Sequence, residues 1–79
     1  MDTIEKRIEE ILMDEDDSID YKNEKHLIDD RLLDSFGIIS LVSDLEEEFD
    51  VKINAVDMVP ENFNSIEGMA SMIKKLQDN

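Results

Sequence analysis

The 79-residue chain contains no cysteine and only one histidine, so it can form neither a disulfide nor a Cys/His zinc site. A domain of this size buries a limited part of its surface, and small domains often depend on such cross-links. Apolar packing alone must therefore stabilise the fold, and we expect residues 1–79 to form a single domain. The lack of cysteine is compatible with a cytoplasmic location.

Basic residues are also scarce, because 8 Lys and Arg stand against 22 Asp and Glu and give a formal net charge of −14. This charge repels nucleic-acid phosphates and anionic lipids, and it favours protein partners that carry basic patches. No apolar run is long enough to span a membrane, and the acidic start "MDTIEKRIEE" is unlike a secretory signal. We therefore expect a cytoplasmic monomer that binds proteins, with no nucleic-acid partner and no membrane insertion.

Apolar residues recur at helical spacing in three segments, with stripes formed by Ile4, Ile8, Ile11 and Leu12, by Ile38, Val42, Leu45 and Phe49, and by Ile66, Met69, Ile73 and Leu76. The first stripe predicts a helix over residues 3–13, after a capping box of Asp2 and Glu5. The second predicts a helix over residues 35–49, with Leu41 at the edge of its stripe and a cap at Asp34 or Ser35. The third helix begins after a cap at Asn64 or Ser65.

The connections between these helices differ in length. The polar segment "DEDDSIDYKNEK" predicts a long loop, pinned to the core by the apolar pairs Leu27-Ile28 and Leu32-Leu33. We expect residues 55–59 to form a short helical turn capped by Asn54. This turn should end before Pro60, because proline disfavours helix at the residue before it. The segment "DVKI" is too short to predict a strand. The sequence thus predicts an all-α bundle of three main helices plus one short helix, with a long loop between the first two.

The sequence suggests a calcium loop and a hydrolase site, but it lacks residues that each of them requires. A calcium loop starting at Asp14 needs glycine at its sixth position and a carboxylate at its twelfth, but Ile19 and Lys25 stand there. A metal-stabilised loop would still raise the melting temperature when calcium is added. A hydrolase would need a base for Ser35, but His26 is the only histidine and no Gly-x-Ser-x-Gly motif is present. We therefore expect no metal site and no enzyme activity of the chain itself.

The second helix carries an unusual outer face. Phe36, Ser40, Ser43 and Glu47 lie roughly opposite the apolar stripe, so a large aromatic side chain next to Ser35 points towards water. Six acids and no base occur in residues 34–50: Asp34, Asp44, Glu46, Glu47, Glu48 and Asp50. Acids near the end of a helix oppose its dipole, so local stability does not explain them. This face is typical of a docking surface for basic partners, although Phe36 folded onto a loop and a merely solvated acidic face remain alternatives.

The stretch "LLDSFGIISLVSDLEEEFDVKI" resembles the cofactor attachment region of acyl carrier proteins, and the resemblance covers nearly the whole chain. It implies that the Ser35 hydroxyl, flanked by Asp34 and Phe36, receives 4′-phosphopantetheine from coenzyme A through a separate phosphopantetheinyl transferase. The thiol of that arm then holds acyl or aminoacyl groups as thioesters. A cofactor-free interaction module is the alternative from another class, and it predicts that Ser35→Ala keeps all activity.

The resemblance also implies partners, namely a loading ligase and an acyltransferase or synthase with basic docking patches. The residues that it places at these contacts or beside the arm and cargo are Phe36, Ser40, Ser43, Asp44, Glu46, Glu47, Val56, Met58 and Val59. The run Phe63-Asn64-Ser65 is similar to that of D-alanyl carrier proteins, which serve cell-envelope polymers. Fatty-acid carriers usually have leucine in place of Phe36 and commonly an acid in place of Ser40. The cargo therefore stays open between D-alanine, another amino acid, a fatty acyl chain and a polyketide intermediate.

Overall fold

The computed structural model describes residues 3–30 and 35–78, and every regular element within them is helical. The elements are α1 (Thr3–Glu15), α2 (Ser35–Phe49), the 3₁₀ turn η1 (Ala55–Asp57), α3 (Pro60–Phe63) and α4 (Ile66–Gln77). The all-α class and the long connection between the first two helices are thereby confirmed. The expected capping residues Asp2 and Asp34 and the pair Leu32-Leu33 lie outside the described residues.

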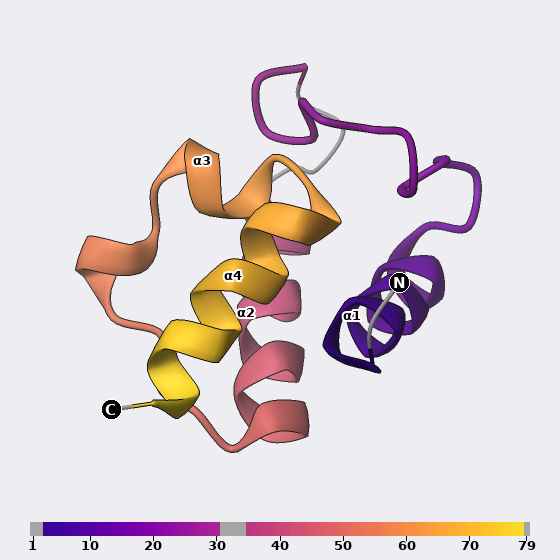
Figure 1. The fold of residues 1–79 in the computed structure, drawn as a ribbon. Coiled ribbons are helices and arrows are strands. Elements are labelled where there is room, and N and C mark those ends of the chain that lie inside the picture. The colour runs from indigo at the N-terminus through magenta and orange to yellow at the C-terminus, as the bar shows by residue number, and fades with distance from the viewer. Residues whose placement is uncertain (1–2, 31–34, 79) are drawn as a thin grey trace.

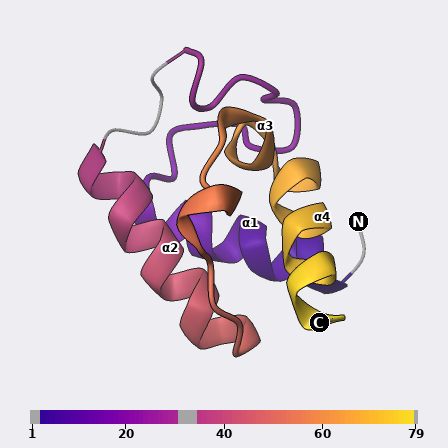
Figure 2. The ribbon, with the colours of Figure 1, turned by 90° about the vertical axis from the view of Figure 1, so that its left-hand side faces the viewer.

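The helices are arranged around α1, which packs against both α2 and α4 (Figures 1 and 2). Helices α2 and α4 run in roughly the same direction, and α3 packs against α4. The connection that follows α1 passes over the end of the molecule at which α2 and α4 begin. The start of α2 and the start of α4 therefore share one end of the bundle with this connection.

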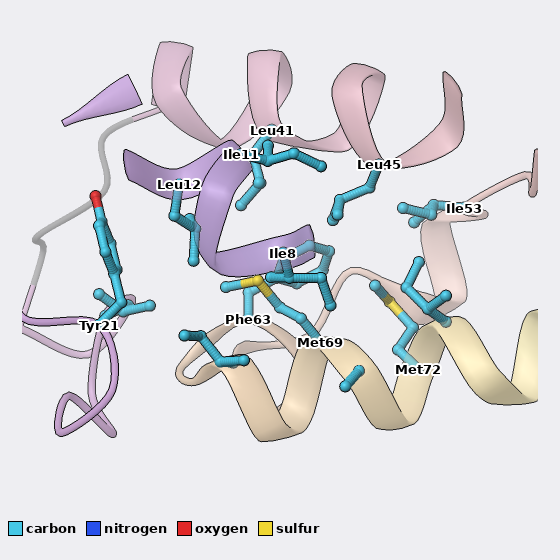
Figure 3. Packing of buried hydrophobic residues seen from close by; sticks show 14 residues of the cluster. Ile8, Ile11, Leu12, Tyr21, Leu41, Leu45, Ile53, Phe63, Met69 and Met72 are labelled. Carbon is cyan, nitrogen blue, oxygen red and sulfur yellow. The ribbon is translucent and has the colours of Figure 1, made fainter. Parts of the chain in front are cut away.

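The core lies between α1, α2 and α4, whose apolar side chains point towards one another (Figure 3). Its most deeply buried aliphatic members, all 0% exposed, are Ile8, Leu12, Leu27, Leu41, Leu45, Met69 and Ile73. On α2 the placement of Leu41 at the edge of the apolar stripe was wrong. Leu41 is fully buried and points towards α1, whereas Ile38 and Val42 of the expected stripe are only half-buried.

The buried residues of α1 and α4 match the apolar stripes predicted for these helices, and the structure corrects where the helices begin and end. Helix α1 continues to Glu15, two residues beyond the expected end at Met13. Helix α4 is capped by Ser65, whose hydroxyl oxygen accepts a hydrogen bond from the Gly68 N–H at 3.0 Å. Asn64, the other candidate cap, is instead the residue that ends α3.

The end of α2 explains part of its acidic sequence. Asp50 has φ 52°, and the Val51 N–H donates to the Glu46 carbonyl at 3.3 Å, which is the pattern of a Schellman cap. The Glu46 carboxylate also accepts a hydrogen bond from the Ile53 N–H at 2.9 Å. Its side chain therefore satisfies a backbone donor in the turn that leaves α2.

The short helical turn expected at residues 55–59 is present as η1 with Asn54 as its cap, but it ends at Asp57, and a further short helix, α3, follows at Pro60. The turn η1 closes when the Asp57 N–H donates to the Asn54 carbonyl at 2.9 Å, and the Asn54 N–H donates to Asp57 Oδ2 at 3.2 Å. Helix α3 then begins at Pro60, because the first position of a helix needs no N–H donor. Met58 and Val59 consequently lie in the link between η1 and α3 and not on a helix.

Candidate functional site

The serine singled out by the sequence is the first residue of α2. The structure describes its backbone within the helix but not its side chain, and Asp34 lies outside the described residues. Within α2 itself, the first turn holds no acidic residue, and this helix start carries the positive end of the dipole. A phosphate group fits such a helix start, because backbone N–H groups and the dipole both favour an anion.

The outer face of α2 is as exposed as the helical projection predicts. Phe36, next to Ser35, is 84% exposed, and Ser40, Ser43 and Glu47 are exposed along the same helix. The alternative in which Phe36 folds back onto a loop is therefore wrong. Sequence reasoning missed Ile39, which is 65% exposed. Its spacing of three residues from Phe36 was the available signal, because positions i and i+3 share a helix face.

An apolar groove lies beside the first turns of α2. It has a volume of about 200 Å³ and is lined by Ile28, Ile38, Met58, Val59, Pro60 and Phe63. The structure thus brings Met58 and Val59 next to Ile38, which lies one turn after Ser35. Val56, which the sequence grouped with them, is 83% exposed and does not line the groove. The site combines a helix start suited to a phosphate with an adjacent apolar surface suited to an aliphatic arm.

The acids of the outer face differ in their surroundings. Asp44 is half-buried where α2 meets the end of α1. Burial raises the pKa of its carboxyl group, and the neighbouring carboxylates of Glu15, Glu47 and Asp14 raise this pKa further. The Ser40 hydroxyl donates a hydrogen bond to Glu15 Oε1 at 2.6 Å across the same junction. The junction between α1 and α2 therefore concentrates negative charge around Asp44.

This crowding predicts that Asp44→Asn stabilises the protein at neutral pH, by about 0.5 kcal/mol in the free energy of unfolding, because it removes like-charge repulsion. A raised pKa means that the folded state holds the Asp44 proton more tightly than the unfolded state does. The wild type therefore gains stability as the pH falls through this raised pKa towards the ordinary value of 3.8, and the advantage of the variant disappears. Urea unfolding at several pH values measures the difference.

Asp17→Asn is the matched control, since Asp17 is an exposed acid of the connection and its removal changes the net charge equally. We expect this control to gain less at neutral pH. A difference in the free energy of unfolding between Asp44→Asn and the wild type that does not change with pH would contradict like-charge crowding at this junction. A loss of stability in the variant at pH 7 would contradict it as well.

Two other acids have local structural partners, so the view that local stability does not explain the acidic run was wrong for them. Glu48 forms an ion pair with Arg7 of α1, and this contact lowers the pKa of the Glu48 carboxyl group. Glu46 is half-buried and binds the Ile53 N–H. Glu47 remains an exposed carboxylate on the outer face, with Asp44 one turn before it partly covered.

The described residues offer little for other chemistry. His26 is exposed, and its Nδ1 lies 3.6 Å from Asp29 Oδ2. Within residues 3–30 and 35–78 no cluster of three His, Asp or Glu side chains is arranged to hold a metal ion. In the same ranges no helix has the length and apolar character needed to cross a membrane.

Comparisons with known proteins show which proteins the chain is similar to. Residues 2–73 match the family model described as a phosphopantetheine attachment site. The acyl carrier protein of Buchnera aphidicola subsp. Baizongia pistaciae (strain Bp) is 36% identical over 77 residues, which cover 95% of this chain and 96% of that protein. The acyl carrier protein of Buchnera aphidicola subsp. Acyrthosiphon pisum (strain Tuc7) is 35% identical over 80 residues, covering 95% and 94% of the two chains. No solved structure is a significant match.

Proposed function

The chain belongs to the acyl carrier protein family, and we propose that Ser35 is the residue that carries its 4′-phosphopantetheine. The cofactor itself follows from the family match, and the observation that supports Ser35 is its place as the first residue of α2. A helix start stabilises the phosphodiester, and the groove lined by Ile38 and Met58 lies next to it. Residues 1–79 act as one carrier domain in the cytoplasm, without catalysing a reaction themselves.

Attachment needs a hydroxyl group from this chain and a base from elsewhere. The Ser35 oxygen bonds to the pantetheine-side phosphorus of coenzyme A, the pyrophosphate bond breaks, and adenosine 3′,5′-bisphosphate leaves. The hydroxyl proton passes to a base of the transferase. When bound, the arm supplies a thiol that holds an acyl or aminoacyl group as a thioester.

The outer face of α2 is the surface that guides the partner enzymes. Phe36 supplies an exposed aromatic anchor, and Asp44 and Glu47 supply charge for basic patches on the transferase, the ligase and the synthase or acyltransferase. The half-buried Glu46 contributes to this field while its carboxylate binds the Ile53 N–H. Ser40 and Ser43 allow close approach because their side chains are small, and Val56, Met58 and Val59 contact the arm or its cargo.

The experiment that tests the function uses the wild-type chain with coenzyme A and a broad-specificity phosphopantetheinyl transferase. We expect the intact mass to increase by a single phosphopantetheinyl group. An unchanged mass with several transferases would support the cofactor-free interaction module, which binds basic proteins through the same acidic face.

The identity of the cargo is a finer question. The run Phe63-Asn64-Ser65 favours a D-alanyl carrier for cell-envelope polymers, with a fatty acyl or polyketide cargo as the alternative. Incubating the phosphopantetheinylated protein with D-alanine, ATP and a D-alanine-activating ligase distinguishes them. A D-alanyl thioester supports the first, whereas loading only by a malonyl transferase supports the second.

Phe36→Ala is expected to raise the KM of the carrier for the transferase about tenfold, because an exposed aromatic anchor contributes binding energy to a docking surface. The free energy of unfolding should change little, since the side chain is 84% exposed. Met13→Ala, which removes another exposed apolar side chain from α1, is the control and should keep the wild-type KM. Equal effects of both substitutions would show that Phe36 is not a specific contact.

A further inference from the structure

Asn64 connects the end of α3 with a part of the long connection that lies about 35 residues earlier in the chain. It follows α3, and its backbone N–H donates to the Pro60 carbonyl at 2.9 Å and so ends that helix. Its remaining polar groups all face residues 27–29 of the long connection. One half-buried side chain therefore holds the connection against the junction of α3 and α4.

The contacts form a helix cap supplied from a distant position. Residues 26–30 make one turn, in which the Asp30 N–H donates to the His26 carbonyl at 2.8 Å. The first N–H groups of such a turn lack partners within it. The Asn64 carbonyl accepts from the Leu27 N–H at 3.0 Å, and Asn64 Oδ1 accepts from the Ile28 and Asp29 N–H groups at 2.9 and 3.0 Å.

A fourth hydrogen bond fixes the orientation of the amide. Asn64 Nδ2 donates to Asp29 Oδ2 at 3.2 Å, so the amide oxygen is directed at the two backbone donors. An Asp side chain does not offer the same combination, because an ionised carboxylate accepts hydrogen bonds but donates none. We call these four hydrogen bonds the Asn64 clamp.

The clamp determines one wall of the candidate site. Leu27 is fully buried, and the next residue, Ile28, lines the apolar groove together with Ile38 and Val59. The chain from Asp30 to Ser35 is at most about 18 Å long, so the clamped turn lies within that distance of the attachment residue. A transferase that docks at the start of α2 therefore meets the turn that Asn64 holds.

We propose that Asn64 is a positioning residue, which keeps Ile28 and its turn in the arrangement that partner enzymes recognise beside Ser35. This inference rests on the proposed function. Without the clamp, the turn samples other arrangements, and only a fraction of carrier molecules is competent for docking. The apparent affinity is the intrinsic affinity multiplied by that fraction, while the chemical step in the docked complex is unchanged.

The first test compares the transferase kinetics of Asn64→Ala with those of the wild type. We expect KM for the carrier to rise about tenfold with kcat unchanged, as population of a competent conformer requires. Carrier concentrations are expressed per folded molecule, with the folded fraction measured by circular dichroism. Amide hydrogen exchange at Ile28 and Asp29 should also accelerate, because these N–H groups lose their acceptor.

Asn62→Ala is the matched control for loss of stability. Asn62 is also half-buried and lies in α3, where its Nδ2 donates to the Asp57 carbonyl at 2.7 Å. This control should keep the wild-type KM and the slow exchange at Ile28. An equal rise in KM for both variants would overturn the positioning role and indicate a general effect of destabilising the α3 region.

Exchange of the two side chains provides a rescue. Asn64→Asp alone keeps an acceptor for the backbone donors but places a carboxylate against that of Asp29, so we expect a raised KM at neutral pH. Combining Asn64→Asp with Asp29→Asn restores one donor and one acceptor, and KM should return towards the wild-type value. A double variant no better than the single one would contradict the clamp.

The outcomes separate this inference from the proposed function. A wild-type chain that accepts no phosphopantetheinyl group overturns the carrier function, and the positioning role with it. A modified wild type together with an unchanged KM for Asn64→Ala overturns the positioning role alone.

Discussion

Ser35→Ala is expected to abolish the gain in mass on treatment with coenzyme A and a phosphopantetheinyl transferase. The reaction needs the serine oxygen as nucleophile, and alanine offers no atom that forms the phosphodiester. The loss should be complete and not graded, because the chain then has no hydroxyl at the start of α2. Intact-mass spectrometry after overnight incubation measures it directly.

Two further variants separate attachment from folding. Ser35 is the first residue of α2, so circular dichroism measures the folded fraction of each variant beside its mass. Ser35→Asn keeps a polar side chain without a hydroxyl and should remain unmodified while it folds like the wild type. Ser71→Ala removes an exposed serine of α4 and should be modified normally. A full mass gain in folded Ser35→Asn would refute attachment at this residue.

Leu41→Ala is expected to destabilise the protein by about 3 kcal/mol, through lost apolar burial and the cavity that remains. Leu41 is fully buried and faces α1 across the core (Figure 3). A chain of this length has a total stability of roughly 4 to 12 kcal/mol, so the loss is a large part of it. Urea unfolding monitored by circular dichroism measures the change, and the melting temperature should fall by about 12 °C or more.

Ile38→Ala is the matched control because it removes the same number of carbon atoms from the same helix. Ile38 is half-buried at the groove, so we expect a cost of about 1 kcal/mol. A larger loss of stability for Ile38→Ala than for Leu41→Ala would support the stripe inferred from the sequence. It would contradict the burial of Leu41 seen in the structure.

The sequence predicted α1, α2 and α4 because each has a regular apolar stripe, whereas α3 has none and was not predicted. It predicted the exposure of Phe36 as well, because a residue opposite the stripe of a single helix must face solvent or a loop. The central residue of the stripe on α2 was not predictable in the same way. Residues Ile38, Ile39, Leu41 and Val42 are all apolar, so only the position of α1 decides which of them becomes most buried.

Burial within the polar loop and contacts between distant residues were outside the reach of sequence reasoning. Tyr21 is buried and its hydroxyl donates to the Asp16 carbonyl at 2.7 Å, yet the sequence around it indicates only a polar loop. The pairing of Arg7 with Glu48 and the contact of Asn64 with Ile28 depend on the path of the whole chain. An acidic residue with such a partner cannot be distinguished by sequence from one that serves a docking surface.

The central claim, that Ser35 carries the arm, is tested most directly by locating the group within the modified wild-type protein. Trypsin cleaves after Arg31 and Lys52 and releases residues 32–52 as one peptide, which contains Ser35, Ser40 and Ser43. Tandem mass spectrometry of this peptide assigns the group to one serine. We predict that all of it lies on Ser35; phosphopantetheine on Ser40, on Ser43 or outside this peptide would contradict the claim.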